Sequence, residues 1–254
     1  MIKNSKEIEG MFDVAVVIPT IVRPSLLEAV HSIFEQNFTG TIQILVGVDK
    51  MLGDHSILEK LFDNVPDRVT ITLFDPQYST SARHGGIHEA RDGGSLRTTL
   101  SFLANSRYVA YLDDDNLWHS NHLETLLKAV VGVDWVYSYR WLVDEETNKK
   151  LTVDKWHSTG PNKGIMKGTS GGFADPNTLL IDKLACADQL HLWSVESDVD
   201  ATYSGADRMF FDGLSLNKTC RSSKRATVYY KMRRTNVLWQ YVNRETRSKE
   251  TQDG

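Results

Sequence analysis

Few cysteines, no long apolar run and no excess of positive charge characterise this 254-residue sequence, and each absence excludes a class of protein. Cys186 and Cys220 have neither a CxxC spacing nor a histidine cluster nearby, so neither a zinc site nor a disulfide is predicted. No stretch approaches the roughly 20 apolar residues that a membrane span needs. The first ten residues carry four charges and no apolar signal segment. We therefore expect a soluble protein of the reducing cytoplasm.

The charge balance and the amount of apolar sequence fit a folded, enzyme-sized protein. A formal net charge of -4 and a pI near 6.1 argue against general nucleic-acid binding. With 41% hydrophobic residues the chain can build a sizeable core, and it has no internal repeat or obvious linker. We therefore expect a single domain spanning residues 1–254.

Strand-like and helix-like patterns alternate through the first half of the chain. β-branched runs predict the strands, and apolar residues at helical spacing predict the helices between them. In order, the predicted elements are a strand at 14–20, a helix at 24–34, a strand at 41–49, a helix at 56–62, a strand at 69–73, a helix at 95–103 and a strand at 108–112. This alternation is typical of a parallel α/β sheet with right-handed crossovers.

The fourth predicted strand ends in three consecutive carboxylates, Asp113, Asp114 and Asp115. Loops after parallel strands meet at one rim of a sheet, so the triplet, Thr20 and Asp49 should lie together. Crowded carboxylates repel one another unless a cation lies among them, and Mg²⁺ or Mn²⁺ with substrate phosphates is the usual solution. The alternative is an acidic loop that caps the next helix.

The second half of the chain predicts less regular structure. Its predicted elements are an antiparallel hairpin at 135–143 and 150–153, loops at 156–164 and 167–172, a strand near 178–181 and a helix at 206–216. The sequence therefore predicts one mixed α/β domain.

Five segments in this order resemble glycosyltransferase family 2, which has the GT-A fold. They are Val16–Thr20, Val46–Asp49, Ser95–Thr98, Tyr108–Asn116 and Ser204–Arg208, spread over roughly residues 13 to 215. The resemblance implies a single GT-A-like domain with a Rossmann-like, mainly parallel sheet and a mixed acceptor-side half. It divides the chain into a nucleotide-sugar-binding half (13–116), an acceptor-side half (117–217) and a basic C-terminal segment (218–254).

The resemblance also implies a reaction. A sugar would move from a nucleotide-sugar donor, usually a UDP-sugar, to a hydroxyl of a glycan or lipid-linked acceptor, with inversion at the anomeric carbon. Mn²⁺ or Mg²⁺ would bind at the DxD motif, with Asp115 the best direct ligand and Asp113 at the other end of the motif. Asp113 or Asp114 would lie nearer the ribose.

At the nucleobase, the resemblance places Pro19 and Thr20 beside the ring and Asp49 on the N3–H group of uracil. A carboxylate has only acceptors, so it suits that N–H, which cytosine lacks. A strand-end turn residue is the alternative interpretation of Asp49. Ile21 and Val22 stand where many relatives carry an aromatic residue for stacking.

Arginines are the candidates for the donor diphosphate, because a guanidinium fork matches phosphate oxygens. Arg97 holds the family's arginine position, with Arg83 and Arg91 as rivals and a surface ion pair as the alternative. In the basic C-terminal segment, eight Lys/Arg residues lie between Lys218 and Arg244 with no acid among them. This segment could close on the diphosphate through Arg233 and Arg234, make peripheral contact with an anionic membrane, or be a solvated tail.

Asp207 matches the carboxylate that ends the family's base motif, although Ala206 stands where the usual Glu would be. The resemblance implies that it acts as general base on the acceptor hydroxyl. The alternative is a first-turn carboxylate favoured by the helix dipole. Glu196, Asp198 and Asp200 are the nearest substitutes.

Weaker acceptor-side candidates are aromatic or flexible. Trp156 and Trp193 could pack an indole against a sugar, although a tryptophan more often anchors a core or loop. His157 could complete the metal site or hold a phosphate. Gly171 and Gly172 would let the backbone approach a donor sugar, or form only a turn.

Three other functions compete with sugar transfer. A nucleotidyltransferase also uses clustered carboxylates and metal, but the loop after the first strand, residues 19–23, contains no glycine. A haloacid-dehalogenase-like phosphatase would place its acidic motif after the first strand rather than the fourth. A catalytically silent glycan-binding module fits the half-present base motif.

Overall fold

The computed structural model describes residues 10–88, 93–195 and 205–250, with the backbone alone for 246–250. Its strands are β1 (Val14–Thr20), β2 (Ile42–Val48), β3 (Val69–Phe74), β4 (Tyr108–Tyr111), β5 (Leu117–Trp118), β6 (Trp135–Asp144), β7 (Lys150–Val153), β8 (Gly160–Pro161), β9 (Gly172–Phe173), β10 (Leu179–Asp182) and β11 (Cys220–Met232). Its α-helices are α1 (Ser25–Phe34), α2 (His55–Lys60), α3 (Gly94–Leu103), α4 (His122–Ala129), α5 (Lys167–Ser170), α6 (Ala206–Asn217) and α7 (Trp239–Glu250). Short 3-10 helices are η1 (Ala82–His84), η2 (Pro176–Thr178) and η3 (Ala187–Ser194).

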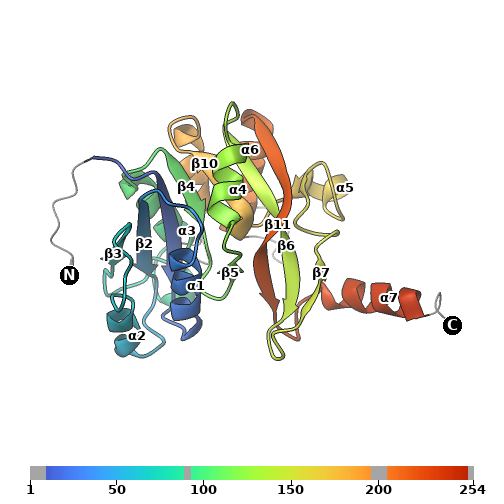
Figure 1. The fold of residues 1–254 in the computed structure, drawn as a ribbon, viewed down its shortest axis with the longest axis horizontal. Coiled ribbons are helices and arrows are strands. Elements are labelled where there is room, and N and C mark those ends of the chain that lie inside the picture. Colours follow the sequence, from blue (N-terminus) through green and yellow to red (C-terminus); the bar gives the residue numbers. More distant parts are fainter. Residues whose placement is uncertain (1–9, 89–92, 196–204, 251–254) are drawn as a thin grey trace.

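Nine strands form one mixed sheet in the order β3-β2-β1-β4-β10-β6-β11-β5, with β7 added to β6 (Figure 1). The first four strands are mutually parallel, which confirms the alternation predicted from the sequence. β10 runs antiparallel to both β4 and β6 and marks the change to the mixed half. Four parallel strands therefore deliver their carboxyl ends to one rim, as expected for a Rossmann-like sheet.

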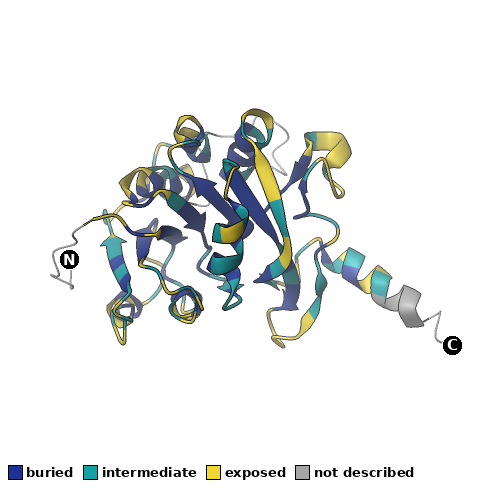
Figure 2. Ribbon diagram, turned by 45° about the horizontal axis from the view of Figure 1, so that its top comes forward, coloured by how far each residue is buried: buried dark blue, intermediate teal, exposed yellow. Residues whose placement is uncertain are grey.

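Both faces of the sheet are covered by helices, which explains why β1 is a continuous apolar run buried along its whole length. Val16 and its neighbours on one face pack against α1, α2 and α4. Val17 and its neighbours on the other face pack against α3, η3 and α6. Figure 2 shows the buried strands between these partly exposed helices.

The C-terminal segment differs most from the expectation. Cys220–Met232 is the longest strand of the sheet, lying parallel to β6 and antiparallel to β5, so the solvated-tail interpretation is wrong for these residues. α7 then extends away from the sheet (Figure 1), with Leu238 and Val242 packed against Leu142 and Met232. No helix in the described part of the chain is long and apolar enough to cross a membrane.

Candidate active site

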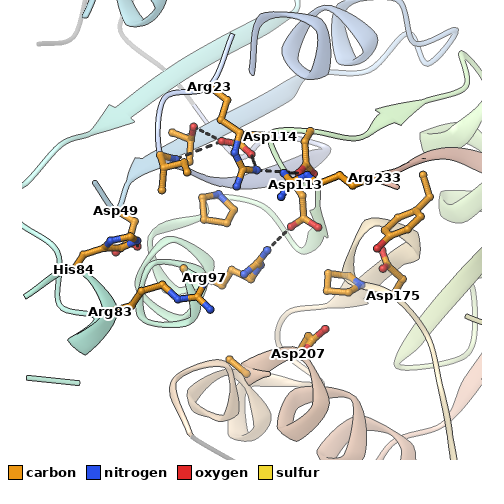
Figure 3. A pocket seen from close by; sticks show the side chains of 18 residues that line it. Arg23, Asp49, Arg83, His84, Arg97, Asp113, Asp114, Asp175, Asp207 and Arg233 are labelled. Carbon is orange, nitrogen blue, oxygen red and sulfur yellow. Dashed lines mark hydrogen bonds and ion pairs between the residues drawn. The ribbon is translucent and has the colours of Figure 1, made fainter. Parts of the chain in front are cut away.

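A pocket of about 360 Å³ opens at the rim where β1, β2 and β4 end, facing the start of α6 and the end of β11 (Figure 3). Its lining consists of Pro19, Thr20, Ile21, Arg23, Asp49, Arg83, His84, Gly93, Arg97, Asp113, Asp114, Asp115, Asp175, Pro176, Ala206, Asp207, Tyr230 and Arg233. The convergence of Thr20, Asp49 and the acidic triplet, predicted from the strand order, is confirmed.

Asp113 is held from both sides. One carboxylate oxygen accepts from the guanidinium of Arg97, which lies over the ring of Trp193 at 5.2 Å from its centroid. The other accepts from Asn177 Nδ2 at 2.8 Å, while the backbone N–H of Asp113 donates to Asn177 Oδ1 at 2.6 Å. Arg97 is only 6% exposed, so this pair is a fixed part of the wall.

Asp114 ties the ends of two strands together. Its Oδ2 accepts from Thr20 Oγ1 at 2.6 Å and from the Ile21 N–H at 3.3 Å, and its Oδ1 accepts from Arg23 Nη1 at 2.8 Å. Burial raises the pKa of Asp114 despite these donors. Asp114 is only 4% exposed, whereas 29% of the Asp113 side chain is exposed, so Asp114 acts mainly to hold the ends of β1 and β4 together in the pocket wall.

Asp115 presents its carboxylate to the pocket with 27% of its side chain exposed. Oδ2 accepts from Arg23 Nη1 at 2.8 Å and from Arg233 Nη2 at 3.0 Å, while Oδ1 has a longer contact of 3.2 Å with Asn116 Nδ2. Burial, followed by repulsion from Asp113 and Asp114, raises the pKa of Asp115 to about 6. The charged form of Asp115 is therefore disfavoured at this position, even with two arginines beside it.

The donor set fits a divalent ion that is shared with a ligand. Among the described residues, no three His, Cys, Asp or Glu side chains form a ready-made metal cage. Mg²⁺ is usually held by one or two carboxylates together with substrate phosphates and water rather than by such a cage. Asp115, with Asp113 on the same wall, can supply that number of ligands.

At the far end of the pocket, Asp49 is 8% exposed and lies beside η1. Its Oδ1 accepts from Ser79 Oγ at 2.7 Å, and its Oδ2 lies 3.8 Å from His84 Nε2. Pro19 borders the same pocket. Asp49 is therefore oriented by the loop after β3, with its second oxygen available to a ligand N–H.

Asp207 lies across the pocket from the triplet, in the first turn of α6 (Figure 3). Its Oδ1 accepts from the Arg208 N–H at 2.9 Å. The positive end of the helix dipole favours a carboxylate at this position. The substitutes Glu196, Asp198 and Asp200 lie outside the described residues, as does Arg91.

A buried ionic network behind the pocket was not predicted, because no local sequence pattern indicates it. Arg140, 1% exposed, donates to Asp154 and Asp175 and lies 3.8 Å from the centroid of the Tyr230 ring. The two aspartates hold the pKa of Arg140 above its usual value although burial opposes this. Asp175 also accepts from Asn177, so the network supports Asp113 through that amide.

Several predicted acceptor-side residues lie away from the pocket. Trp193 is fully buried and stacks on Phe210 at 4.2 Å between ring centroids, so the proposed sugar contact is wrong and the indole is a core residue. Trp156 stacks on Tyr241 at 5.7 Å, and His157 lies against Arg140. Neither of these two side chains lines the pocket.

The glycine pair and one of the two predicted C-terminal arginines also face elsewhere. Gly171, with φ of +69°, caps α5, and Gly172, with φ of +93°, is the first residue of β9. A Cβ on Gly172 would lie 2.3 Å from the Gly160 carbonyl oxygen, so this glycine is required for packing. Arg233 lines the pocket, whereas Arg234 pairs with Glu146 at 2.7 Å outside it.

No family model matches the sequence, and no curated protein does. Solved structures do resemble the fold. S. aureus TarS 1–349 in complex with UDP-GlcNAc is similar at a TM-score of 0.64 and 15% identity, over 89% of this chain and 60% of that one. Another structure of S. aureus TarS is similar at a TM-score of 0.61 and 14% identity, over 87% of this chain and 37% of that one. The mannosyltransferase PcManGT from Pyrobaculum calidifontis, in complex with GDP-Man and Mn²⁺, is similar at a TM-score of 0.60 and 13% identity. The match covers 95% of this chain and 64% of that one.

These likenesses establish the fold as GT-A-like, in agreement with the resemblance drawn from the sequence motifs. This chain spans between 37% and 64% of the length of these three structures.

Proposed function

We propose that this chain is a glycosyltransferase that moves a sugar from a nucleotide-sugar donor, preferably a UDP-sugar, to a hydroxyl of a glycan or lipid-linked acceptor with inversion. The observation that carries the proposal is one pocket in which Asp49, the acidic triplet and Asp207 face a common space. The similar structures add support, since one is a complex with UDP-GlcNAc and another a complex with GDP-Man and Mn²⁺.

The pocket offers a place for each part of such a donor. In this proposal Asp49 accepts the base N–H, and the partly exposed carboxylate of Asp115, which lines the same pocket, faces the diphosphate. A bound Mn²⁺ or Mg²⁺ would neutralise charge on the departing nucleoside diphosphate. Asp113 and Asp115 would hold that ion.

Across the pocket, Asp207 removes the proton of the acceptor hydroxyl. A sugar hydroxyl is a weak nucleophile at neutral pH, so a carboxylate at hydrogen-bonding distance lowers the barrier to its attack. Attack from the face opposite the diphosphate inverts the anomeric carbon. The position of Asp207 opposite the triplet supports this direction of approach (Figure 3).

A panel of UDP-, GDP- and CDP-sugars tests the proposal. Release of nucleoside diphosphate is measured with Mn²⁺ or with chelator, using simple alkyl glycosides as acceptors. We expect turnover with at least one donor, dependent on the cation and absent in Asp115→Asn. Nucleotide binding without any turnover would favour the silent glycan-binding module, and binding unaffected by chelator would remove the metal from the proposal.

A further inference from the structure

Three arginines balance the three carboxylates of the triplet. Arg97 pairs with Asp113, and Arg233 pairs with Asp115. Arg23 contacts two carboxylates at once, because its Nη1 lies 2.8 Å from Asp114 Oδ1 and 2.8 Å from Asp115 Oδ2. We call this last arrangement the Arg23 bridge. With three positive and three negative side chains, this part of the pocket is close to neutral before any ligand enters.

The three arginines differ in how firmly they are held. Arg97 has 7% of its side chain exposed and is fixed between Asp113 and the Trp193 ring. Arg23 has 36% of its side chain exposed, and both of its contacts with the triplet use the same nitrogen. A guanidinium carries five N–H donors, so Arg23 can exchange one partner for another without leaving the pocket.

The backbone before Arg23 is unusual in a way that fixes its direction. Val22 is buried and has φ of +65°, a conformation that a β-branched residue adopts only under strain. Its N–H donates to Thr20 Oγ1 at 2.8 Å, and that hydroxyl in turn donates to Asp114. This kink turns the chain at the end of β1 and sets Arg23 over the triplet. Strain of this kind concentrates at ligand sites.

We propose that Arg23 is a donor-binding residue that occupies Asp114 and Asp115 in the nucleotide-free protein and moves to the diphosphate when donor and cation arrive together. This inference rests on the proposed function. A cation alone must displace a guanidinium from Asp115, so it binds weakly. A diphosphate alone meets arginines that are already paired. Together they bring an anion for Arg23 and a cation for Asp115, so the two ligands bind cooperatively.

The test measures two affinities in one variant, with opposite expected signs. Arg23→Met keeps much of the side-chain length and removes the charge. Without nucleotide, its affinity for Mn²⁺, followed by the EPR signal of the free ion, should rise by about tenfold or more because Asp115 loses a competing cation. With saturating Mn²⁺, its affinity for UDP should fall by about tenfold or more because the diphosphate loses a guanidinium partner.

Arg107→Met is the matched control, since Arg107 pairs with Asp182 on the surface outside the pocket. It should change neither affinity. Arg23→Lys retains the charge without the guanidinium fork, so it should weaken UDP binding while raising Mn²⁺ affinity less than Arg23→Met does. If Arg23→Met does not fold, as judged by circular dichroism, Arg23→Lys takes its place in both affinity measurements.

Unchanged or weaker Mn²⁺ binding in folded Arg23→Met would overturn the competition, and unchanged UDP binding would overturn the transfer to diphosphate. The Mn²⁺ measurement needs no nucleotide and therefore separates this inference from the proposed function. If the wild-type protein binds neither UDP, GDP nor CDP but Mn²⁺ affinity still rises in Arg23→Met, the proposed function fails and the Arg23 bridge stands.

Discussion

Replacing Asp115 with Asn should stabilise the ligand-free protein while removing its response to the metal. Burial and the two neighbouring aspartates raise the pKa of Asp115 from 3.8 to about 6, even with Arg23 and Arg233 beside it. Roughly 2 pKa units at about 1.4 kcal/mol each set an upper limit of about 3 kcal/mol on the cost of its charge. Because 27% of the side chain is exposed to screening solvent, we expect a gain of about 1 kcal/mol in the free energy of unfolding at pH 7.5.

The pH dependence fixes the sign of this effect. A carboxyl with a raised pKa in the folded state contributes stability below its unfolded pKa of about 3.8 and loses it as the pH rises through about 6. Asn does not titrate. The difference between Asp115→Asn and wild type should therefore be absent near pH 4 and grow to its full value by pH 7.

Urea unfolding in EDTA, repeated from pH 4 to 7.5, measures this difference, and thermal shift with UDP and Mn²⁺ measures the lost response. Asp188→Asn is the control of opposite sign, because a hydrogen bond from Lys218 lowers the pKa of Asp188. Its substitution should slightly destabilise the protein at pH 7.5. A destabilised Asp115→Asn, or a gain independent of pH, would refute the reasoning.

The remaining predictions separate catalysis, donor binding and support of the site. Asp207→Asn should lower turnover by roughly 10² to 10⁴ with nucleotide affinity near wild type; single-turnover transfer at the wild-type rate would place the base elsewhere. Arg233→Ala should weaken UDP binding measured by calorimetry, whereas Arg234→Ala should not. An equal loss of UDP affinity in both variants would contradict the assignment of Arg233 to the pocket and Arg234 to the surface outside it. Arg140→Leu should lower the free energy of unfolding, measured in urea, by about 3–5 kcal/mol, because it leaves two buried carboxylates without their cation. An unchanged free energy of unfolding would show that the buried network does not stabilise the fold.

The fold of the first half of the chain, residues 13–116, was predicted well because its signals are local. β1 and β2 are buried along their whole length and are mostly apolar, and the polar residues Thr20 and Asp49 stand at the end of the first and directly after the second. Their meeting at one rim follows from strand order alone. The role of Asp207 remains a prediction, although its position at the start of α6 is confirmed.

The features that the sequence did not predict depend on distant partners. Arg23 meets carboxylates 91 and 92 positions away, and nothing in its own neighbourhood indicates this. Trp193 follows Leu192 in η3, and only the tryptophan of these two adjacent apolar residues is fully buried, so the local sequence could not distinguish a core indole from an exposed one. In β11, register shifts between Ser222 and Val228 interrupt the alternation that would have indicated a strand.

The place of β11 also bears on the order in which the molecule is made. Synthesis proceeds from the N-terminus, so a chain that has emerged only to residue 217 already carries its acidic triplet but neither Arg233 nor the strand that pairs with β5. During that interval Asp115 has only Arg23 as a counterion, and one edge of β6 lacks its parallel neighbour. Arrival of β11 supplies the second arginine partner of Asp115 and the missing neighbour of β6 together, so the sheet and the charge balance of the pocket are completed in the same step.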